Sequence, residues 1–144
     1  MQETHAALYV HLVWSTWQRE PCLQGDIGRQ VYRLIGAKCQ ELEVKIIALG
    51  GIEDHVHLLV SLPTTLSVAQ LAKHLKGASS RIIGKQLANS PTQFFKWQAG
   101  YGAVTVSPSG LSEVAHYITQ QRAHHAGGTL LRAWEPRPDG PVAE

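Results

Sequence analysis

Two histidines separated by one residue are the clearest candidates for chemistry in this sequence. His55 and His57 flank Val56 in an apolar run that continues to Leu62. Alternate side chains of a β-strand point to the same face, so both imidazoles would face the same way. Two imidazoles on one strand suit a divalent cation, but two ligands are too few for a tight site. Because the chain has eight histidines, a structural pair arising by chance remains an equal interpretation of this motif alone.

A tyrosine and a glutamine four residues apart suggest a second half of such a site. In a helix, this spacing places Tyr117 and Gln121 on one face, about one turn apart. A tyrosine has an ordinary pKa of about 10, so a nucleophilic tyrosine depends on positive charge or a base nearby. The amide oxygen of Gln121 would suit a hard cation such as Mg²⁺ or Mn²⁺. Taken alone, Tyr117 could equally be an ordinary half-buried residue.

The residue pattern predicts the elements that must position these groups. β-Branched and aromatic runs predict strands, and apolar residues at helical spacing predict helices. The predicted strands cover residues 7–16, 44–49, 55–62, 94–98 and 103–107, and the predicted helices cover 25–43, 111–126 and the segment from the N-cap Ser67 to about Leu87. Gly50 and Gly51 are expected to end the second strand, because glycine often marks a turn.

The order of these elements predicts the fold class. A βαββαββα order is the split βαβ pattern of ferredoxin-like and RRM-like sheets, with one added helix. We therefore expect an α+β fold: an antiparallel sheet with helices on one face, plus a C-terminal helix that carries Tyr117. A chain of 144 residues with 44% hydrophobic content suits one domain. We place it at residues 1–132, followed by an extended or disordered tail at 133–144.

Charge, apolar runs and cysteines narrow the class of protein further. A net charge of +2 is too small to indicate nucleic-acid binding by itself. The stretch from Lys73 to Lys85 is locally basic and has no carboxylate, which predicts either a basic binding surface or a solvated helix face. No apolar run reaches the roughly 20 residues of a membrane span, and no signal peptide is evident, so we expect a cytoplasmic protein with no membrane partner. Cys22 and Cys39 are expected to be reduced and structural.

Four segments, in order, resemble the successive motifs of the single-tyrosine HUH transposases. This group comprises the small insertion-sequence-200-like transposases and relatives associated with bacterial repetitive extragenic palindromes. The segments are Gly50–Val60, Leu75–Arg81, Gly100–Gly102 and Tyr117–His125. The similarity spans roughly residues 5 to 126 and departs from the family pattern at Glu53, where proline is common, and at Gln120, where asparagine is common.

The resemblance implies a metal-dependent transposase that cleaves and rejoins single-stranded DNA at hairpin ends. It implies that Tyr117 is the nucleophile and that His55, His57 and Gln121 hold Mg²⁺ or Mn²⁺. Such enzymes form a 5′-phosphotyrosine and leave a free 3′-OH that can later attack that linkage, so no nucleotide cofactor is needed. The family also implies a homodimer with shared active sites, in which the tyrosine helix can complete the partner's site.

DNA contacts are expected from polar and aromatic residues outside this centre. Phosphate contacts position a strand without specifying its sequence, and the candidates for them are Lys76, Ser79, Ser80 and Arg81. Tyr101 is a candidate for stacking on an unpaired base, and Arg19 is a candidate for reading a hairpin or its flanking bases. His11 is expected to be a core histidine or to support the ligands.

Two other functions fit parts of the pattern. A ferredoxin-like module that binds single-stranded nucleic acid without catalysis would use the aromatic residues, but would not explain why the histidine pair and the Tyr-x-x-x-Gln spacing occur together. A metallohydrolase that activates water would need a base. Glu53 and Asp54 adjoin the histidine pair, but the directions of their side chains do not follow from the sequence.

Overall fold

The computed structural model describes residues 3–120 of the chain. In chain order, the described elements are β1 (Tyr9–Ser15), the 3-10 turn η1 (Trp17–Arg19), α1 (Gly25–Glu41), β2 (Lys45–Ile52), β3 (His55–Ser61), α2 (Val68–Gln86), β4 (Gly102–Thr105), the 3-10 turn η2 (Pro108–Gly110) and α3 (Leu111–Thr119).

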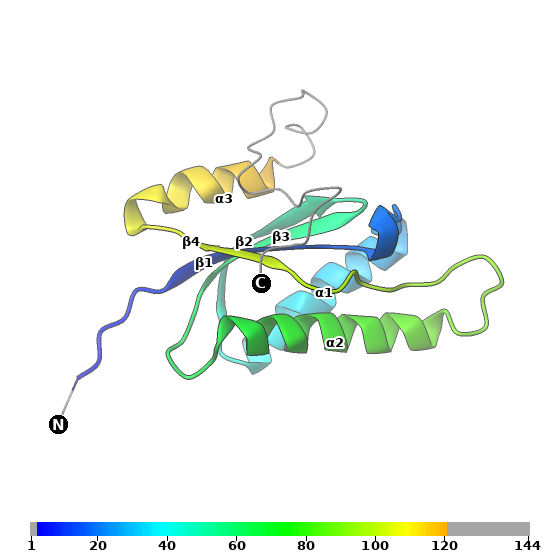
Figure 1. The fold of residues 1–144 in the computed structure, drawn as a ribbon, viewed down its shortest axis with the longest axis horizontal. Helices are drawn as coiled ribbons and strands as arrows, with labels where there is room; N and C mark the ends of the chain where they lie inside the picture. Colours follow the sequence, from blue (N-terminus) through cyan, green and yellow to red (C-terminus); the bar gives the residue numbers. More distant parts are fainter. Residues whose placement is uncertain (1–2, 121–144) are drawn as a thin grey trace.

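The strands form one sheet in the order β2-β3-β1-β4, and every neighbouring pair is antiparallel. β3 thus lies between β1 and β2, which run in the same direction, as the split βαβ pattern requires. Helices α1 and α2 cover one face of the sheet, and α3 lies across the other face (Figure 1). The predicted α+β fold, including its added helix, is confirmed.

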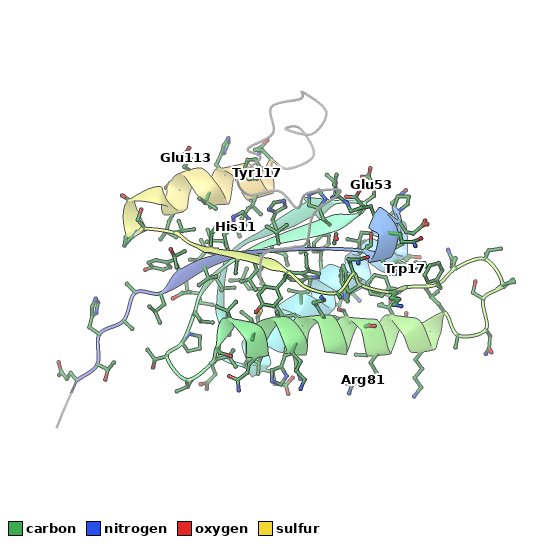
Figure 2. All side chains as sticks on the ribbon, viewed as in Figure 1. His11, Trp17, Glu53, Arg81, Glu113 and Tyr117 are labelled. Atoms are coloured by element: carbon green, nitrogen blue, oxygen red, sulfur yellow. The ribbon has the colours of Figure 1, made fainter. Side chains whose placement is uncertain are left out.

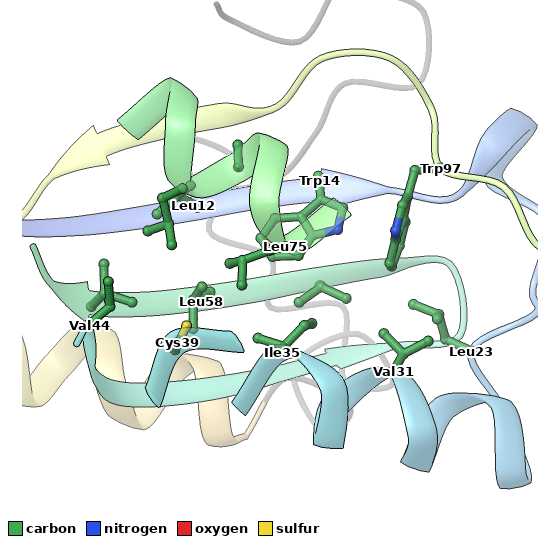
Figure 3. Close-up of a cluster of buried hydrophobic side chains, with 14 of the residues drawn as sticks. Leu12, Trp14, Leu23, Val31, Ile35, Cys39, Val44, Leu58, Leu75 and Trp97 are labelled. Carbon is green, nitrogen blue, oxygen red and sulfur yellow. The ribbon is translucent and has the colours of Figure 1, made fainter. Parts of the chain in front are cut away.

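The main hydrophobic core lies between the sheet and the helices α1 and α2. Alternate strand residues point into it, and each helix contributes residues three or four positions apart, as an amphipathic helix should. Figure 3 shows part of this cluster, which includes Leu12, Trp14, Leu58, Val31, Ile35, Cys39 and Leu75. Burial of each large side chain contributes roughly 1.5–3 kcal/mol. This core stabilises the sheet that carries the histidines.

A local capping signal accounts for the start of α2, and the two cysteines are unpaired in the structure. Ser67 caps α2 as predicted: its hydroxyl accepts a hydrogen bond from the Gln70 backbone, and the Gln70 side chain accepts one from the Ser67 backbone. Both cysteines are free thiols, as expected. Burial raises the pKa of Cys39 to about 11, which makes this thiol unreactive at neutral pH.

The prediction that two glycines end the second strand is wrong. β2 continues through Gly50 and Gly51 to Ile52, and these glycines pair with His57 and Val56 of β3. They mark close approaches rather than a turn: a Cβ on Gly50 would lie 2.4 Å from the Ile118 carbonyl oxygen. The sequence shows the glycines but not the helix that packs on them.

The predicted strand at residues 94–98 is also wrong. This segment makes an isolated bridge between Trp97 and Thr16, and regular pairing resumes only in β4. The carbonyls of Gln98 and Gly100 accept hydrogen bonds from Lys76 Nζ, each at 2.8 Å. Backbone pairing with the end of β1 is limited to residues 96–98, where the Lys96 carbonyl accepts a hydrogen bond from Trp17 N and Gln98 N donates to the Ser15 carbonyl, each at 2.9 Å. Lys76 satisfies the carbonyls on the other side of this short contact.

The third predicted helix begins at Leu111, as expected, and its described part ends at Thr119. Gln121, the rest of this predicted helix and the predicted tail at 133–144 lie outside the described residues, so the domain limits remain a prediction. Among residues 3–120, no helix has the length and apolar character needed to cross a membrane.

Candidate active site

The two histidines of β3 lie on the sheet face that α3 covers. Their ring centroids are 5.0 Å apart, and both side chains are fully buried. Across the strands, His57 is opposite Val13 of β1 and Gly50 of β2. As predicted, strand alternation puts His55 and His57 on one face, while Val56 and Leu58 join the core on the other.

The candidate nucleophile lies against this pair in the same chain. Val114, Tyr117 and Ile118 form the buried stripe of α3, at helical spacing. The Tyr117 ring meets the His57 ring edge-on, with centroids 5.7 Å apart, and Tyr117 is 2% exposed. Figure 2 shows Tyr117 on α3 above the sheet, with His11 between that helix and the strands. Folding thus brings two motifs that are distant in sequence into contact.

Gly50 allows α3 to approach the sheet this closely. It is the cross-strand neighbour of His57, and its missing Cβ leaves room for the backbone of Ile118. A larger residue would push the helix, and Tyr117 with it, away from the histidines. Glycine inside a strand is a known signal of close backbone approach. This signal could have suggested the role of Gly50 from the sequence.

His57 is hydrogen-bonded to a third histidine. His11 Nε2 on β1 lies 2.8 Å from His57 Nδ1, and both side chains are fully buried. This placement agrees with the prediction that His11 supports the candidate ligands. Its signal in the sequence is a polar residue inside an otherwise apolar strand.

His55 is hydrogen-bonded to a carboxylate in the turn between β2 and β3. Asp54 Oδ1 lies 2.7 Å from His55 Nδ1, and Asp54 also accepts hydrogen bonds from Arg19 Nε at 3.1 Å and from Arg19 Nη2 at 3.3 Å. Burial raises the pKa of Asp54, but the hydrogen bonds from His55 and Arg19 outweigh it, so the net pKa is lowered. Asp54 is therefore an anion at neutral pH. The sequence did not reveal this role for Asp54, because the direction of its side chain depends on the hairpin.

The backbone at Arg19 is unusual. Gln18 and Arg19 have φ values of 53° and 56°, a region that few residues other than glycine adopt. This conformation directs Arg19 back toward the turn that carries Asp54. Arg19, predicted to read DNA, is about one-third exposed and is engaged in this ion pair.

The donor set fits part of a site for a divalent metal. Imidazole nitrogens are good ligands for such ions, and each ring is held through Nδ1, which leaves Nε2 on the opposite side of the ring. In the described part of the chain, no group of three or more His, Cys, Asp or Glu side chains is placed to hold a metal ion. A complete set requires a further ligand, and the predicted one, Gln121, lies outside that part.

Two predicted DNA contacts have internal roles. Ser79 is fully buried; its hydroxyl donates to the Leu75 carbonyl at 2.7 Å and accepts from Trp97 Nε1 at 2.9 Å. Its position does not support a phosphate contact. Lys76 is half-buried and donates to two loop carbonyls, and desolvation lowers its pKa.

The other DNA candidates lie away from the histidine pair. Arg81 is exposed and projects from the side of α2 remote from the sheet, opposite the face that carries Tyr117 (Figure 2). Ser80 is partly exposed beside it on α2, and Tyr101 is partly buried just before β4. The structure thus brings together His55, His57 and Tyr117, but it does not bring Ser80 or Arg81 to them.

A comparison with protein families agrees with this arrangement. The family described as "Transposase IS200 like" matches residues 4–121. The chain belongs to this transposase family. The match includes both histidines, Tyr117 and Gln121.

Characterised relatives support the same assignment. The chain is 27% identical over 117 residues to the ISDra2 transposase TnpA of Deinococcus radiodurans. The matched region covers 79% of this chain and 84% of that protein. It is 26% identical over 134 residues to the transposase for insertion sequence element IS200 of Salmonella typhimurium, covering 91% and 86% of the two chains.

Solved structures share the fold. A crystal structure assigned as a transposase from Deinococcus radiodurans has a TM-score of 0.63 at 25% identity and covers 84% of this chain and 98% of that one. A REP-associated tyrosine transposase bound to a REP hairpin has a TM-score of 0.66 at 14% identity, covering 100% and 94%. At that identity, the second likeness concerns the fold alone.

Proposed function

We propose that this transposase cleaves and rejoins single-stranded DNA at hairpin ends. In this proposal, Tyr117 is the nucleophile, and His55, His57 and Gln121 hold a divalent metal ion, Mg²⁺ or Mn²⁺. The observation that carries the proposal is the packing of the Tyr117 ring against His57 in a member of this family. The likeness in fold to a tyrosine transposase bound to a REP hairpin supports a hairpin-bearing substrate.

In the proposed reaction, the phenolic oxygen of Tyr117 attacks a backbone phosphorus in line with the leaving 3′ oxygen. The new bond is a 5′-phosphotyrosine, and the bond from phosphorus to the 3′ oxygen breaks. The phenol loses its proton to solvent, and the 3′ oxygen takes one up. A phosphodiester is exchanged for another phosphodiester, so the released 3′-OH can reverse the reaction or join a new strand without a nucleotide cofactor.

The chain supplies the ligands and the alignment. A divalent ion bound there would neutralise phosphate charge and favour in-line attack. His55 and His57 would bind it through Nε2, and Gln121, four residues after Tyr117, would reach the same centre from the tyrosine helix. Because Tyr117 is 2% exposed, we expect strand binding to accompany a local opening around α3.

A covalent adduct tests this function. The protein, incubated with a hairpin-bearing single strand and Mn²⁺, should give a protein–DNA species that resists denaturants, and EDTA should prevent it. Tyr117→Phe keeps the ring and removes the hydroxyl, so it should form no adduct, while Tyr9→Phe at the start of β1 serves as the matched control. Cleavage retained by Tyr117→Phe would favour attack by water, and strand binding by the wild-type protein without cleavage would favour a binding module.

Mixed variants test the proposed homodimer with shared sites. If the tyrosine helix serves the partner's histidines, a mixture of Tyr117→Phe with His57→Ala should recover up to about a quarter of the wild-type adduct. If the contact seen within one chain is the catalytic one, the mixture stays inactive. The first result would assign the tyrosine helix to trans action, and the second to cis action. A heterodimer purified through a different tag on each subunit controls for subunit exchange.

DNA contacts outside the centre complete the proposal. Arg81 and Ser80 could bind phosphates only if the DNA strand passes round the molecule to the outer side of α2. Lys76 could bind a phosphate only next to the loop whose carbonyls it already contacts. Tyr101 and Arg19 remain proposed contacts nearer the sheet. We expect changes at Arg81, Ser80, Lys76 and Tyr101 to alter DNA affinity more than the rate of adduct formation.

A further inference from the structure

We infer that His11 and Asp54 are positioning residues that fix the tautomer and direction of the two candidate metal ligands. His11 holds His57, and Asp54, held by Arg19, holds His55. The inference rests on the proposed metal site and assigns a separate partner to each of the two histidines, His55 and His57.

The contact between His11 and His57 determines where the protons lie. A hydrogen bond between two neutral imidazoles needs one N–H and one lone pair. For His57 to offer the lone pair of Nε2 to a metal, its proton must be on Nδ1, which then donates to His11 Nε2 at 2.8 Å. His11 consequently carries its own proton on Nδ1. A side chain that cannot accept at this position would remove the hydrogen bond that keeps the His57 proton on Nδ1.

The contact between Asp54 and His55 gives the same result with a charged partner. An ionised carboxylate can only accept, so His55 Nδ1 must donate to Asp54 Oδ1 at 2.7 Å, and the lone pair lies on Nε2. Arg19 Nη2 is also 3.4 Å from His55 Nδ1, but a guanidinium has no lone pair to accept that proton. We therefore assign the proton to the bond with Asp54. Arg19 acts on His55 through the carboxylate, which it fixes with two hydrogen bonds.

The two supports differ in strength. Asp54 carries a negative charge next to a ring that would bind a cation, whereas the imidazole of His11 brings no negative charge. Loss of a partner that orients a metal-bound histidine typically weakens metal affinity about 10- to 100-fold. We expect Asp54→Asn toward the lower end of that range, because the amide oxygen can still accept, and Asp54→Leu toward the upper end. His11→Leu should weaken binding more than His11→Gln, whose amide can reach the position of Nε2.

Mn²⁺ binding to the protein without DNA tests the inference independently of catalysis. The dissociation constant is measured by titration calorimetry for the wild type, the four variants and Arg19→Gln, with thermal unfolding followed for each. The matched controls are Asp26→Asn, which also removes an Asp–Arg pair but on exposed α1, and His74→Gln on the exposed side of α2. Adduct formation is then measured across Mn²⁺ concentrations.

We expect the Asp54 and His11 variants to raise the dissociation constant, and to recover adduct at high Mn²⁺, while both controls match the wild type. Wild-type affinity in Asp54→Asn, Asp54→Leu and His11→Gln would overturn the inference, even if His11→Leu fails to fold. If the wild type forms the adduct and His57→Ala abolishes Mn²⁺ binding, such a result leaves the proposed function intact. A wild type that neither binds Mn²⁺ nor forms adduct contradicts both.

Discussion

The two faces of the sheet differ in what they bury. One face packs against two long helices and buries mainly apolar side chains, around Leu12, Leu58 and Trp14. The other face packs against α3, whose described part has nine residues, and buries three histidines beside the small cluster of Ala48, Leu59, Val114, Tyr117 and Ile118. Adjacent residues of β3 serve opposite faces.

This difference separates stability from chemistry within one sheet. The large apolar core stabilises the strands that hold the histidines, because apolar burial is the main favourable term in folding. The smaller cluster gives α3 less apolar burial, and elements with few buried contacts open at a lower free energy than the core. Tyr117, the proposed nucleophile, therefore lies on a helix whose described part has less apolar burial than α1 or α2, whereas the histidines proposed as metal ligands lie on the well-packed sheet.

The largest expected effect comes from truncating the apolar face. Leu58→Ala should lower the free energy of unfolding by about 4 kcal/mol, and Leu59→Ala by about 2–3 kcal/mol, because the cost of a cavity depends on how well its surroundings can collapse. Both residues are fully buried, so the pair is matched in exposure. Urea unfolding measures the change. Equal losses would contradict the difference between the faces.

Gly50→Ala should act on the other face. Its Cβ would lie 2.4 Å from the Ile118 carbonyl oxygen, so α3 has to shift. A displacement of about 1 Å at a reacting group can cost about 100-fold in rate, and we expect a loss of that order in adduct formation with a smaller loss of stability than in Leu58→Ala. Gly36→Ala on α1, where an added Cβ meets no atom within 4 Å, is the control. Adduct at the wild-type rate would show that α3 docking does not position Tyr117.

Ser67→Ala should lower the stability of the protein without changing adduct formation. Loss of the N-cap costs about 1 kcal/mol, and α2 lies on the face opposite the histidines. Thermal unfolding should detect this loss, while adduct formation at a temperature well below unfolding stays unchanged. The exposed neighbour Thr64→Ala should change neither. A large loss of adduct in Ser67→Ala would mean that the two faces are coupled.

Arg81→Ala should have the smallest effect. If its side chain contacts a phosphate, the slope of log affinity against log salt should fall by about 1, and affinity should fall less than tenfold. Adduct formation at saturating DNA should be unchanged, because Arg81 lies on the side of α2 remote from Tyr117. Arg33→Ala on α1 controls for loss of surface charge. A salt slope equal to that of the wild type would remove Arg81 from the DNA-binding surface.

Much of the fold and part of the site follow from local patterns. The helix at α1, the N-cap of α2 and the shared face of His55 and His57 depend on residue periodicity and capping, which neighbouring residues in the chain decide. The strand predicted over 94–98 failed because its pairing with the chain near Thr16 is limited to one bridge, and a distant lysine binds the Gln98 carbonyl where that pairing would have to continue. The role of Gly50 was missed because its cause is a helix more than sixty residues away.

The sequence by itself determined the order of elements, the pairing of two histidines on one strand, and the resemblance from which Tyr117 was chosen. Only the tertiary structure decided that Tyr117 packs on His57 within one chain, that His11 and Asp54 hold the histidines, and that Ser79 is internal. The physical reason is range. Periodicity acts over a few residues, whereas hydrogen-bond partners and the side of the sheet that a helix covers depend on chain segments that meet only when the protein folds.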